Sequence, residues 1–128
     1  MKEEKIKALM IEPRKRPCVV ELGNDLDSLQ KAVSIGADYQ GLIEFVYLED
    51  NVSVLLNEEG KLIGLEPNRR LGNDILVGVF YVVAEDEEGN LVSLSAEAQN
   101  KYSKMFWQYE DIPSDDIANT IFARFIGR

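Results

Sequence analysis

The sequence contains no histidine and only one cysteine, Cys18. Histidine is the commonest general base and a usual zinc ligand, so its absence removes most acid–base and zinc chemistry. A lone cysteine cannot form an internal disulfide, which agrees with a reducing compartment. Without histidine it also lacks the usual base of a thiol nucleophile, and it lies in a strand-like segment. We therefore expect Cys18 to be a buried structural thiol.

Long hydrophobic runs are also missing. The N-terminal apolar run, residues 8–11, is too short for the core of a signal peptide, and no later segment approaches the length of a membrane span. The nucleotide-binding glycine motifs and the nucleophile elbow G-x-S-x-G are absent as well. These absences predict a cytoplasmic protein without a membrane segment and without a familiar cofactor site.

Positive charge is scarce. The 128 residues carry a formal net charge of -9, with a sequence pI near 4.5. The negative electrostatic field of such a protein repels nucleic acid and anionic membranes, so we expect no direct nucleic-acid binding. A small local anion site is still allowed, because charges more than about 10 Å away are largely screened at about 0.1 M salt. The length and a hydrophobic content of 45% suit one domain with a real core.

Hydrophobic patterning predicts an α+β fold: a mostly antiparallel β-sheet with two β-hairpins, one early helix and two C-terminal helices. Strands are expected at residues 6–11, 18–22, 42–48, 52–56, 75–83 and 91–94, the strongly apolar 75–83 being central. Asn24 is the expected N-cap of a helix at residues 25–35. Ser95 and Ser114 are the expected caps of the two last helices.

The same turn motif, Glu-Glu-Gly, occurs twice between apolar segments, at residues 58–60 and 87–89. A glycine after two polar residues is typical of a hairpin turn that requires a positive φ. We therefore predict hairpins at residues 52–65 and 79–94, with Gly60 and Gly89 in the left-handed conformation.

The C-terminal segment has an apolar stripe that must be covered. It consists of Ile117, Ile121, Phe122 and Phe125, preceded by Met105, Phe106 and Trp107. The stripe can dock on its own sheet or on that of a neighbouring copy, so homo-oligomer formation through the C-terminal helices is one of two open alternatives.

Two arginines are not explained by turn chemistry. Pro67 and Asn68 suit a turn, but Arg69 and Arg70 do not belong to one, and arginine offers a planar donor fork for carboxylate or phosphate. They can instead pair with the abundant acidic residues and cover apolar surface. Asn57 can close an Asx-turn or face a ligand.

Arg14, in the basic turn PRKRP at residues 13–17, is either a solvated hairpin tip or the second half of an anion site with Arg69 and Arg70. The ligand-binding residues that we predict are Asn57, Asn68, Arg69, Arg70 and Arg14. We predict no catalytic residues, no metal ligands and no cofactor.

An acidic cluster at residues 85–88 offers the one alternative chemistry. Its carboxylates could attract a divalent cation and support a metal-assisted hydrolase acting on a phosphoester. The cluster lacks the alternating spacing of a calcium-binding loop, and a solvated hairpin tip is the better explanation of it. The sequence therefore favours a non-enzymatic protein.

The order of segments resembles an uncharacterised family of small proteins, a domain of unknown function. The motif NEEGKL-x-GL-x-x-NR carries the resemblance, here Asn57 to Leu62, Gly64-Leu65 and Asn68-Arg69, followed by Gly78-Val79-Phe80. The resemblance covers roughly residues 6–95 of a single α+β domain spanning residues 1–128, with a C-terminal helical extension from about residue 95.

Members of this family are encoded by phages and mobile elements of Gram-positive gut bacteria and by their hosts. The resemblance implies an accessory role such as counter-defence in the cytoplasm of a bacterial host. Combined with the arginine pair, it leads us to expect a binding protein that sequesters a small anionic, nucleotide-like ligand or a host protein.

Overall fold

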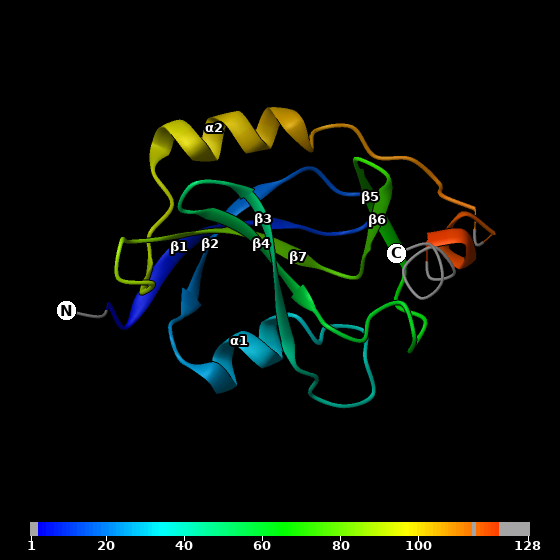
Figure 1. Cartoon of the computed structure of the whole chain (residues 1–128), viewed down its shortest axis with the longest axis horizontal. Coiled ribbons are helices and arrows are strands. Elements are labelled where there is room, and N and C mark those ends of the chain that lie inside the picture. The colour runs from blue at the N-terminus through cyan, green and yellow to red at the C-terminus, as the bar shows by residue number, and fades with distance from the viewer. Residues whose placement is uncertain (1–2, 114, 121–128) are drawn as a thin grey trace.

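The computed structural model describes residues 3–113 and 115–120 (Figure 1). The strands are β1 (Lys5–Ile11), β2 (Cys18–Gly23), β3 (Ile43–Glu49), β4 (Val52–Asn57), β5 (Pro67–Leu71), β6 (Asp74–Val77), β7 (Phe80–Glu85) and β8 (Leu91–Val92). The helices are α1 (Leu26–Ala32) and α2 (Ala96–Met105), and residues 115–120 are also helical. The α+β class, with one early and two later helices, is confirmed.

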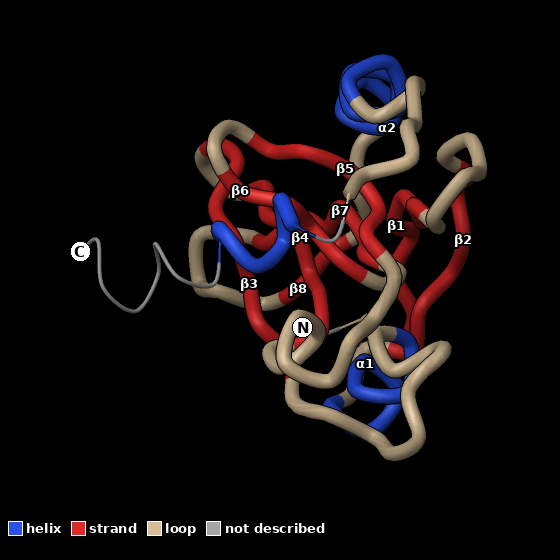
Figure 2. The backbone as a smooth tube through the Cα atoms, turned by 90° about the vertical axis from the view of Figure 1, so that its right-hand side faces the viewer, coloured by secondary structure: helices blue, strands red, loops and turns tan. Residues whose placement is uncertain are grey.

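The strands form a six-stranded antiparallel sheet in the order β2-β1-β7-β4-β3, with β8 paired to β7, and a separate two-stranded sheet of β5 and β6. Helices α1 and α2 lie on opposite faces of the large sheet (Figures 1 and 2). The core under α2 is centred on Phe80 and Phe106, whose rings meet edge to face at 5.2 Å. The core on the α1 face includes Leu29, Val33 and Tyr81.

The early helix is shorter than predicted, and its predicted N-cap was wrong. Asp25 caps α1, because its carboxylate accepts a hydrogen bond from the Ser28 amide at 2.8 Å. Asn24 is instead buried, and its side-chain amide donates to the carbonyls of Glu3 (2.9 Å) and Leu91 (3.2 Å). Asn24 thus joins the N-terminal segment to β8.

The predicted strand at residues 75–83 is broken in two. Gly78 has φ 71°, and its amide donates to the carbonyl of Glu66 at 2.6 Å, so the ladder stops there. The first part, β6, pairs with β5, and the second part, β7, lies between β1 and β4 in the large sheet. An L-residue rarely adopts such a φ, whereas glycine does so without a steric penalty. The central position of β7 agrees with the prediction.

One predicted hairpin is confirmed and the other is wrong. Strand β7 turns through residues 86–90 into β8, with Gly89 at φ 86°. Strand β4, however, is paired on both sides by β3 and β7, so residues 61–65 have no edge to join. They form turns in which the Ile63 amide donates to the Glu59 carbonyl at 3.0 Å. Gly60 has no positive φ; the left-handed glycine of this segment is Gly64, at φ 77°.

The C-terminal segment follows the predicted order. Ser95 caps α2 by accepting a hydrogen bond from the Ala98 amide at 3.1 Å. Ile117 packs on the chain's own cluster of Ile75, Val77 and Ile112. The predicted cap Ser114 and the rest of the stripe (Ile121, Phe122 and Phe125) lie outside the described residues. In the described ranges no helix is long and apolar enough to cross a membrane.

Candidate functional site

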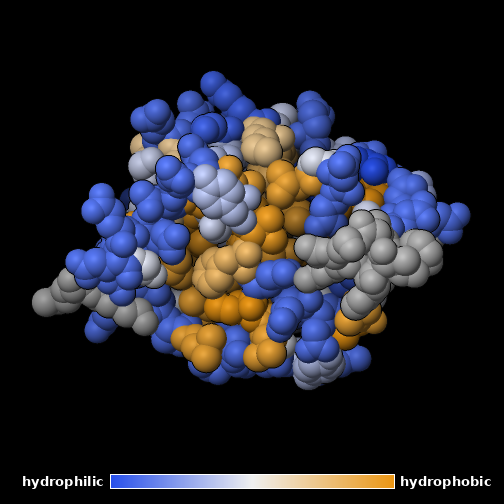
Figure 3. Space-filling model, viewed as in Figure 1, coloured by the Kyte–Doolittle hydropathy of each residue, from blue (hydrophilic) through white to orange (hydrophobic). Residues whose placement is uncertain are grey.

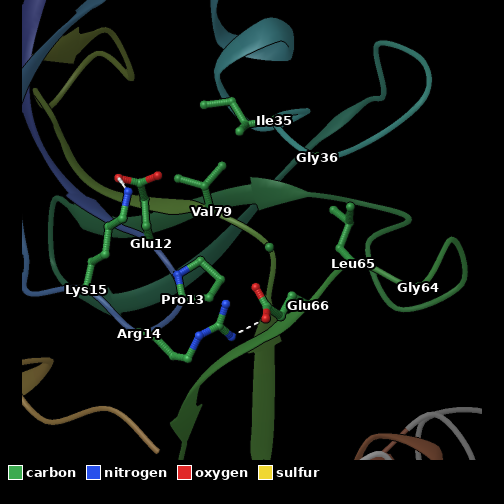
Figure 4. Close-up of a pocket in the computed structure, with 11 residues that line it drawn as sticks. Glu12, Pro13, Arg14, Lys15, Ile35, Gly36, Gly64, Leu65, Glu66 and Val79 are labelled. Carbon is green, nitrogen blue, oxygen red and sulfur yellow. Dashed lines mark hydrogen bonds and ion pairs between the residues drawn. The ribbon is translucent and has the colours of Figure 1, made fainter. Parts of the chain in front are cut away.

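A pocket of about 490 Å³ opens where four separate segments meet (Figure 4). They are the turn after β1, the start of the segment after α1, the 57–66 loop and the break between β6 and β7. The pocket is lined by Glu12, Pro13, Arg14, Lys15, Ile35, Gly36, Gly64, Leu65, Glu66, Gly78 and Val79. No two of these segments are adjacent in the sequence, so the pocket is a product of the fold.

Charged side chains of both signs line the pocket. Arg14 makes an ion pair and a hydrogen bond with Glu66, and both side chains are about half exposed. This hydrogen bond raises the pKa of Arg14 above its usual value. The Lys15 ammonium lies 3.6 Å from a Glu12 carboxylate oxygen. The Arg14 and Lys15 side chains therefore line the pocket while paired with carboxylates (Figure 4).

The backbone at the pocket is unusual in two ways. Arg14 has φ 57°, a conformation that a long side chain rarely adopts and that is enriched at functional sites. Gly36 and Gly64 also have positive φ, and a Cβ atom at either would meet no heavy atom within 4 Å. Open space therefore lies next to the backbone at both glycines.

Asn68, a predicted ligand residue, lies behind the pocket wall. It is 1% exposed, and its side-chain amide donates to the carbonyls of Ile11 (2.9 Å) and Gly78 (2.8 Å). Gly78 lines the pocket, and Ile11 directly precedes the turn that does. Asn68 thus holds two parts of the wall together.

Arg69 is buried in the same way, with 4% of its surface exposed. Its guanidinium donates to the carbonyl of Phe106 at 2.9 Å and to that of Lys15 at 2.6 Å, and its Nη1 donates to Asn68 Oδ1 at 2.7 Å. Burial, followed by the nearby charge of Arg16, lowers the pKa of Arg69. Phe106 is the C-cap of α2, so the cation also lies at the negative end of the helix dipole.

The two basic clusters therefore meet through Arg69 and the turn at residues 13–17, but not through Arg70. Arg70 is exposed and forms ion pairs with Glu110 and Asp116, both at 2.8 Å. It does not line the pocket. Next to Arg69, the guanidinium of Arg16 lies over the ring of Trp107 at 4.9 Å. This second contact ties the basic turn to the segment after α2.

Asn57 closes the Asx-turn that the sequence suggested, because its Oδ1 accepts a hydrogen bond from the Glu59 amide at 2.9 Å. The residue is 2% exposed, and its Nδ2 has no hydrogen-bond partner in the described parts of the chain. A Cβ at Gly41 would lie 2.6 Å from this atom, so Gly41 makes room for the amide. Asn57 shapes the start of the loop whose end, Gly64 to Glu66, lines the pocket.

Of the five predicted ligand residues, only Arg14 lines the pocket. Sequence reasoning missed Glu12, Leu65 and Glu66, because nothing in their neighbourhood separates them from ordinary strand ends and turns. The position of Glu66, between the motif's Leu65 and Asn68, was the one available signal. The assignment of Asn57, Asn68, Arg69 and Arg70 as ligand contacts stays a prediction.

The remaining chemical candidates have local explanations. Asp86 accepts hydrogen bonds from the amides of Asn90 and Glu88, both at 2.9 Å, and these bonds, that from Asn90 foremost, lower its pKa. The acidic cluster is therefore built around a turn. Cys18 is exposed, so the expectation of a buried thiol was wrong; it opens β2, an edge strand that in the described ranges pairs with β1 alone. Across the described ranges, no cluster of three or more potential metal-binding side chains is found.

The chain belongs to the family described as a domain of unknown function, DUF3846, whose model matches residues 6–107. The match includes α2 and the carbonyl of Phe106 to which Arg69 donates. It also contains every residue that lines the pocket. No curated protein and no solved structure matches the chain.

Proposed function

We propose that this protein is a non-enzymatic binding protein whose pocket at the basic turn captures a small anionic ligand of the nucleotide type. The observation that carries the proposal is the place of the segment at residues 57–70. Its Gly64, Leu65 and Glu66 line the pocket, and its Asn68 and Arg69 fasten the opposite wall from behind. The segment that carries the resemblance noted in the sequence therefore lines one part of this pocket and holds another part in place.

The lining chemistry supports a ligand with an apolar ring and an anionic group. Ile35, Leu65 and Val79 offer apolar contacts for a base or ring. Arg14 offers a fork that matches phosphate oxygens, and Lys15 offers a second positive charge. The volume of about 490 Å³ falls in the range of small-molecule sites, about 300–1,000 Å³.

Glu66 competes with an anion for Arg14. An ion pair between half-exposed side chains contributes little, because water and salt screen it. A phosphate that binds the guanidinium with two parallel hydrogen bonds can therefore displace Glu66, and the released carboxylate can turn to solvent. We infer that the Arg14–Glu66 pair opens when the ligand binds.

The biological setting belongs to the same proposal. The resemblance noted in the sequence suggests a phage or mobile-element origin, and sequestration of a nucleotide signal would serve counter-defence in the cytoplasm of a bacterial host. A host protein is the alternative partner. We do not extend the proposal to a metal-assisted hydrolase, since the carboxylate oxygens of Asp86 already accept hydrogen bonds within their own turn.

A thermal-shift screen with mononucleotides, dinucleotides and cyclic oligonucleotides tests the proposal, with inorganic phosphate as the reference anion. A ligand at one hundred times its dissociation constant should add about 2.7 kcal/mol to the free energy of unfolding. If none of these compounds raises the melting temperature above that in phosphate, the small-ligand proposal fails and a host protein becomes the better candidate.

Two variants then place the site. Arg14→Asn removes the guanidinium but keeps a residue that tolerates positive φ, and it should weaken binding of the ligand found in the screen. Glu66→Gln removes the competing carboxylate and should tighten it. Lys31 and Asp27 form an exposed ion pair on α1 and do not line the pocket. Lys31→Asn and Asp27→Asn are therefore matched controls, and neither should change the affinity for the ligand. An affinity that is unchanged in both pocket variants would place the binding site elsewhere.

A further inference from the structure

Glu12 and Lys15 are the two charged residues of the pocket lining that lie outside the Arg14–Glu66 pair. A turn brings them together, because the Lys15 amide donates to the Glu12 carbonyl at 3.2 Å. Arg69 holds this turn from behind: its guanidinium donates to the Lys15 carbonyl at 2.6 Å and, more weakly, to the Glu12 carbonyl at 3.5 Å. One buried cation thus fixes the backbone of both residues, so their side chains extend from a rigid support.

The Glu12 carboxylate has hydrogen-bonding capacity that the described residues leave unused. Its side chain is 27% exposed, and the contact that these residues give it is the Lys15 ammonium at 3.6 Å, which is longer than a hydrogen bond. An ionised carboxylate has two oxygens that accept from several donors. A ligand with two adjacent donors can therefore bond both oxygens of Glu12 without displacing a hydrogen bond from the described part of the chain.

Exposed apolar residues do not by themselves mark a site. Figure 3 shows apolar residues at the surface in the middle of the face seen in Figure 1, with hydrophilic residues around them. Ile35 is 54% exposed, and what distinguishes it is its place in a pocket that charged side chains also line. An apolar wall beside a carboxylate suits a flat ring that carries polar groups on its edge.

The two sides of the pocket differ in character. Figure 4 shows Ile35 and Val79 on the same side as the Glu12 carboxylate. The Arg14 guanidinium lies on the other side of Pro13 (Figure 4). The apolar ring of a ligand therefore fits the Glu12 side, and its anionic group fits the Arg14 side.

On the basis of the proposed nucleotide capture, we propose that the ligand is a guanine nucleotide, with its base at Glu12 and its phosphate at Arg14. The base-pairing edge of guanine carries two adjacent donors, N1–H and the 2-amino group, next to the acceptor O6. The donors match the two oxygens of the Glu12 carboxylate, and O6 matches the Lys15 ammonium beside it. Ile35 and Val79 contact the ring.

The other bases do not match this arrangement. Adenine and cytosine each present a ring nitrogen acceptor beside their amino group, so a lone pair would face one oxygen of the Glu12 carboxylate. Uracil has a single N–H donor between two carbonyl acceptors. A ribose diol offers two donors, but it is polar and gains less than a base from the apolar side chains of Ile35 and Val79. Guanine is the base that uses both carboxylate oxygens and the apolar wall.

Calorimetric titration of the full chain with GMP, IMP and AMP tests the assignment. IMP keeps N1–H and O6 but lacks the 2-amino group, so it should bind about tenfold to a hundredfold more weakly than GMP, as expected for one lost charge-assisted hydrogen bond. AMP should bind more weakly still. IMP or AMP binding as tightly as GMP would overturn the guanine assignment and leave nucleotide capture standing. Absence of GMP binding would also overturn it, and the thermal-shift screen of the other nucleotides decides separately whether a nucleotide is captured.

Glu12→Gln tests whether Glu12 reads the base. The amide keeps the shape of the side chain but offers one acceptor oxygen, so the affinity for GMP should fall about tenfold or more. The affinity for AMP should not fall, because the amide can donate to adenine N1. Glu58→Gln is the matched control: it removes the same charge from an exposed position in the 57–66 loop that does not line the pocket, and it should preserve the preference for GMP. A Glu12→Gln protein that keeps the wild-type preference for GMP would overturn the assignment.

Discussion

At the scale of single residues, Arg69 is the side chain on which the sequence and the structure differ most. One donor of Arg69 bonds the neighbouring Asn68, whereas others reach Lys15 and Phe106, far away along the chain. Such contacts between distant segments are invisible in a local pattern. Asn57 shows the opposite case: its Asx-turn to Glu59 is local, and the sequence suggested it correctly.

We expect Arg69→Ala to lower the stability by about 3 kcal/mol or more, because buried carbonyl oxygens would lose their donors, each at a cost of about 1–3 kcal/mol, and a cavity would remain. Arg70→Ala is the matched control: its ion pairs are exposed, so the melting temperature should hardly change. Urea unfolding followed by circular dichroism measures both. An Arg69→Ala protein as stable as the wild type would mean that the guanidinium does not join these segments.

At the scale of elements, segments with local signals were predictable. The alternation in β1, the apolar runs of β3 and β4, and the serine cap of α2 all lie where the sequence placed them. The hairpin at residues 52–65 was wrong because the Glu-Glu-Gly motif sets a turn but not the partner of β4, and both edges of β4 were already taken. The pocket could not be predicted because it needs the break at Gly78, which an apolar strand pattern conceals.

The two left-handed glycines of these elements should differ in their tolerance of alanine. Gly89 is at φ 86° with open space around it, so Gly89→Ala should cost about 1–2 kcal/mol from backbone strain alone. At Gly78, φ 71°, a Cβ would also lie 2.8 Å from Leu65 Cδ1, which adds overpacking of about 1–3 kcal/mol.

Chemical denaturation of both variants checks this ranking. Leu65 lines the pocket, so Gly78→Ala should also weaken the ligand identified by the thermal-shift screen, while Gly89→Ala should not. Equal losses of stability at the two positions would show that Leu65 can move away from position 78 without cost, and that the break between β6 and β7 is less tightly packed than its contacts indicate.

At the scale of the whole molecule, the net charge of -9 acts on the proposed ligand site. An anion at Arg14 is attracted by the local positive charge and repelled by the rest of the protein. Salt screens both forces, because the Debye length falls from about 30 Å at 0.01 M to about 10 Å at 0.1 M. The balance between local and long-range charge therefore decides the sign of the salt effect.

We expect binding of the anionic ligand to strengthen as salt rises from about 0.01 M to about 0.1 M, because its contact with the Arg14 guanidinium is much shorter than either Debye length while the repulsion from the rest of the protein is long-range. Calorimetric titration at several salt concentrations measures this directly. Binding that instead weakens as salt is added would mean that the attraction around Arg14 extends beyond the contact itself and outweighs the repulsion from the rest of the protein.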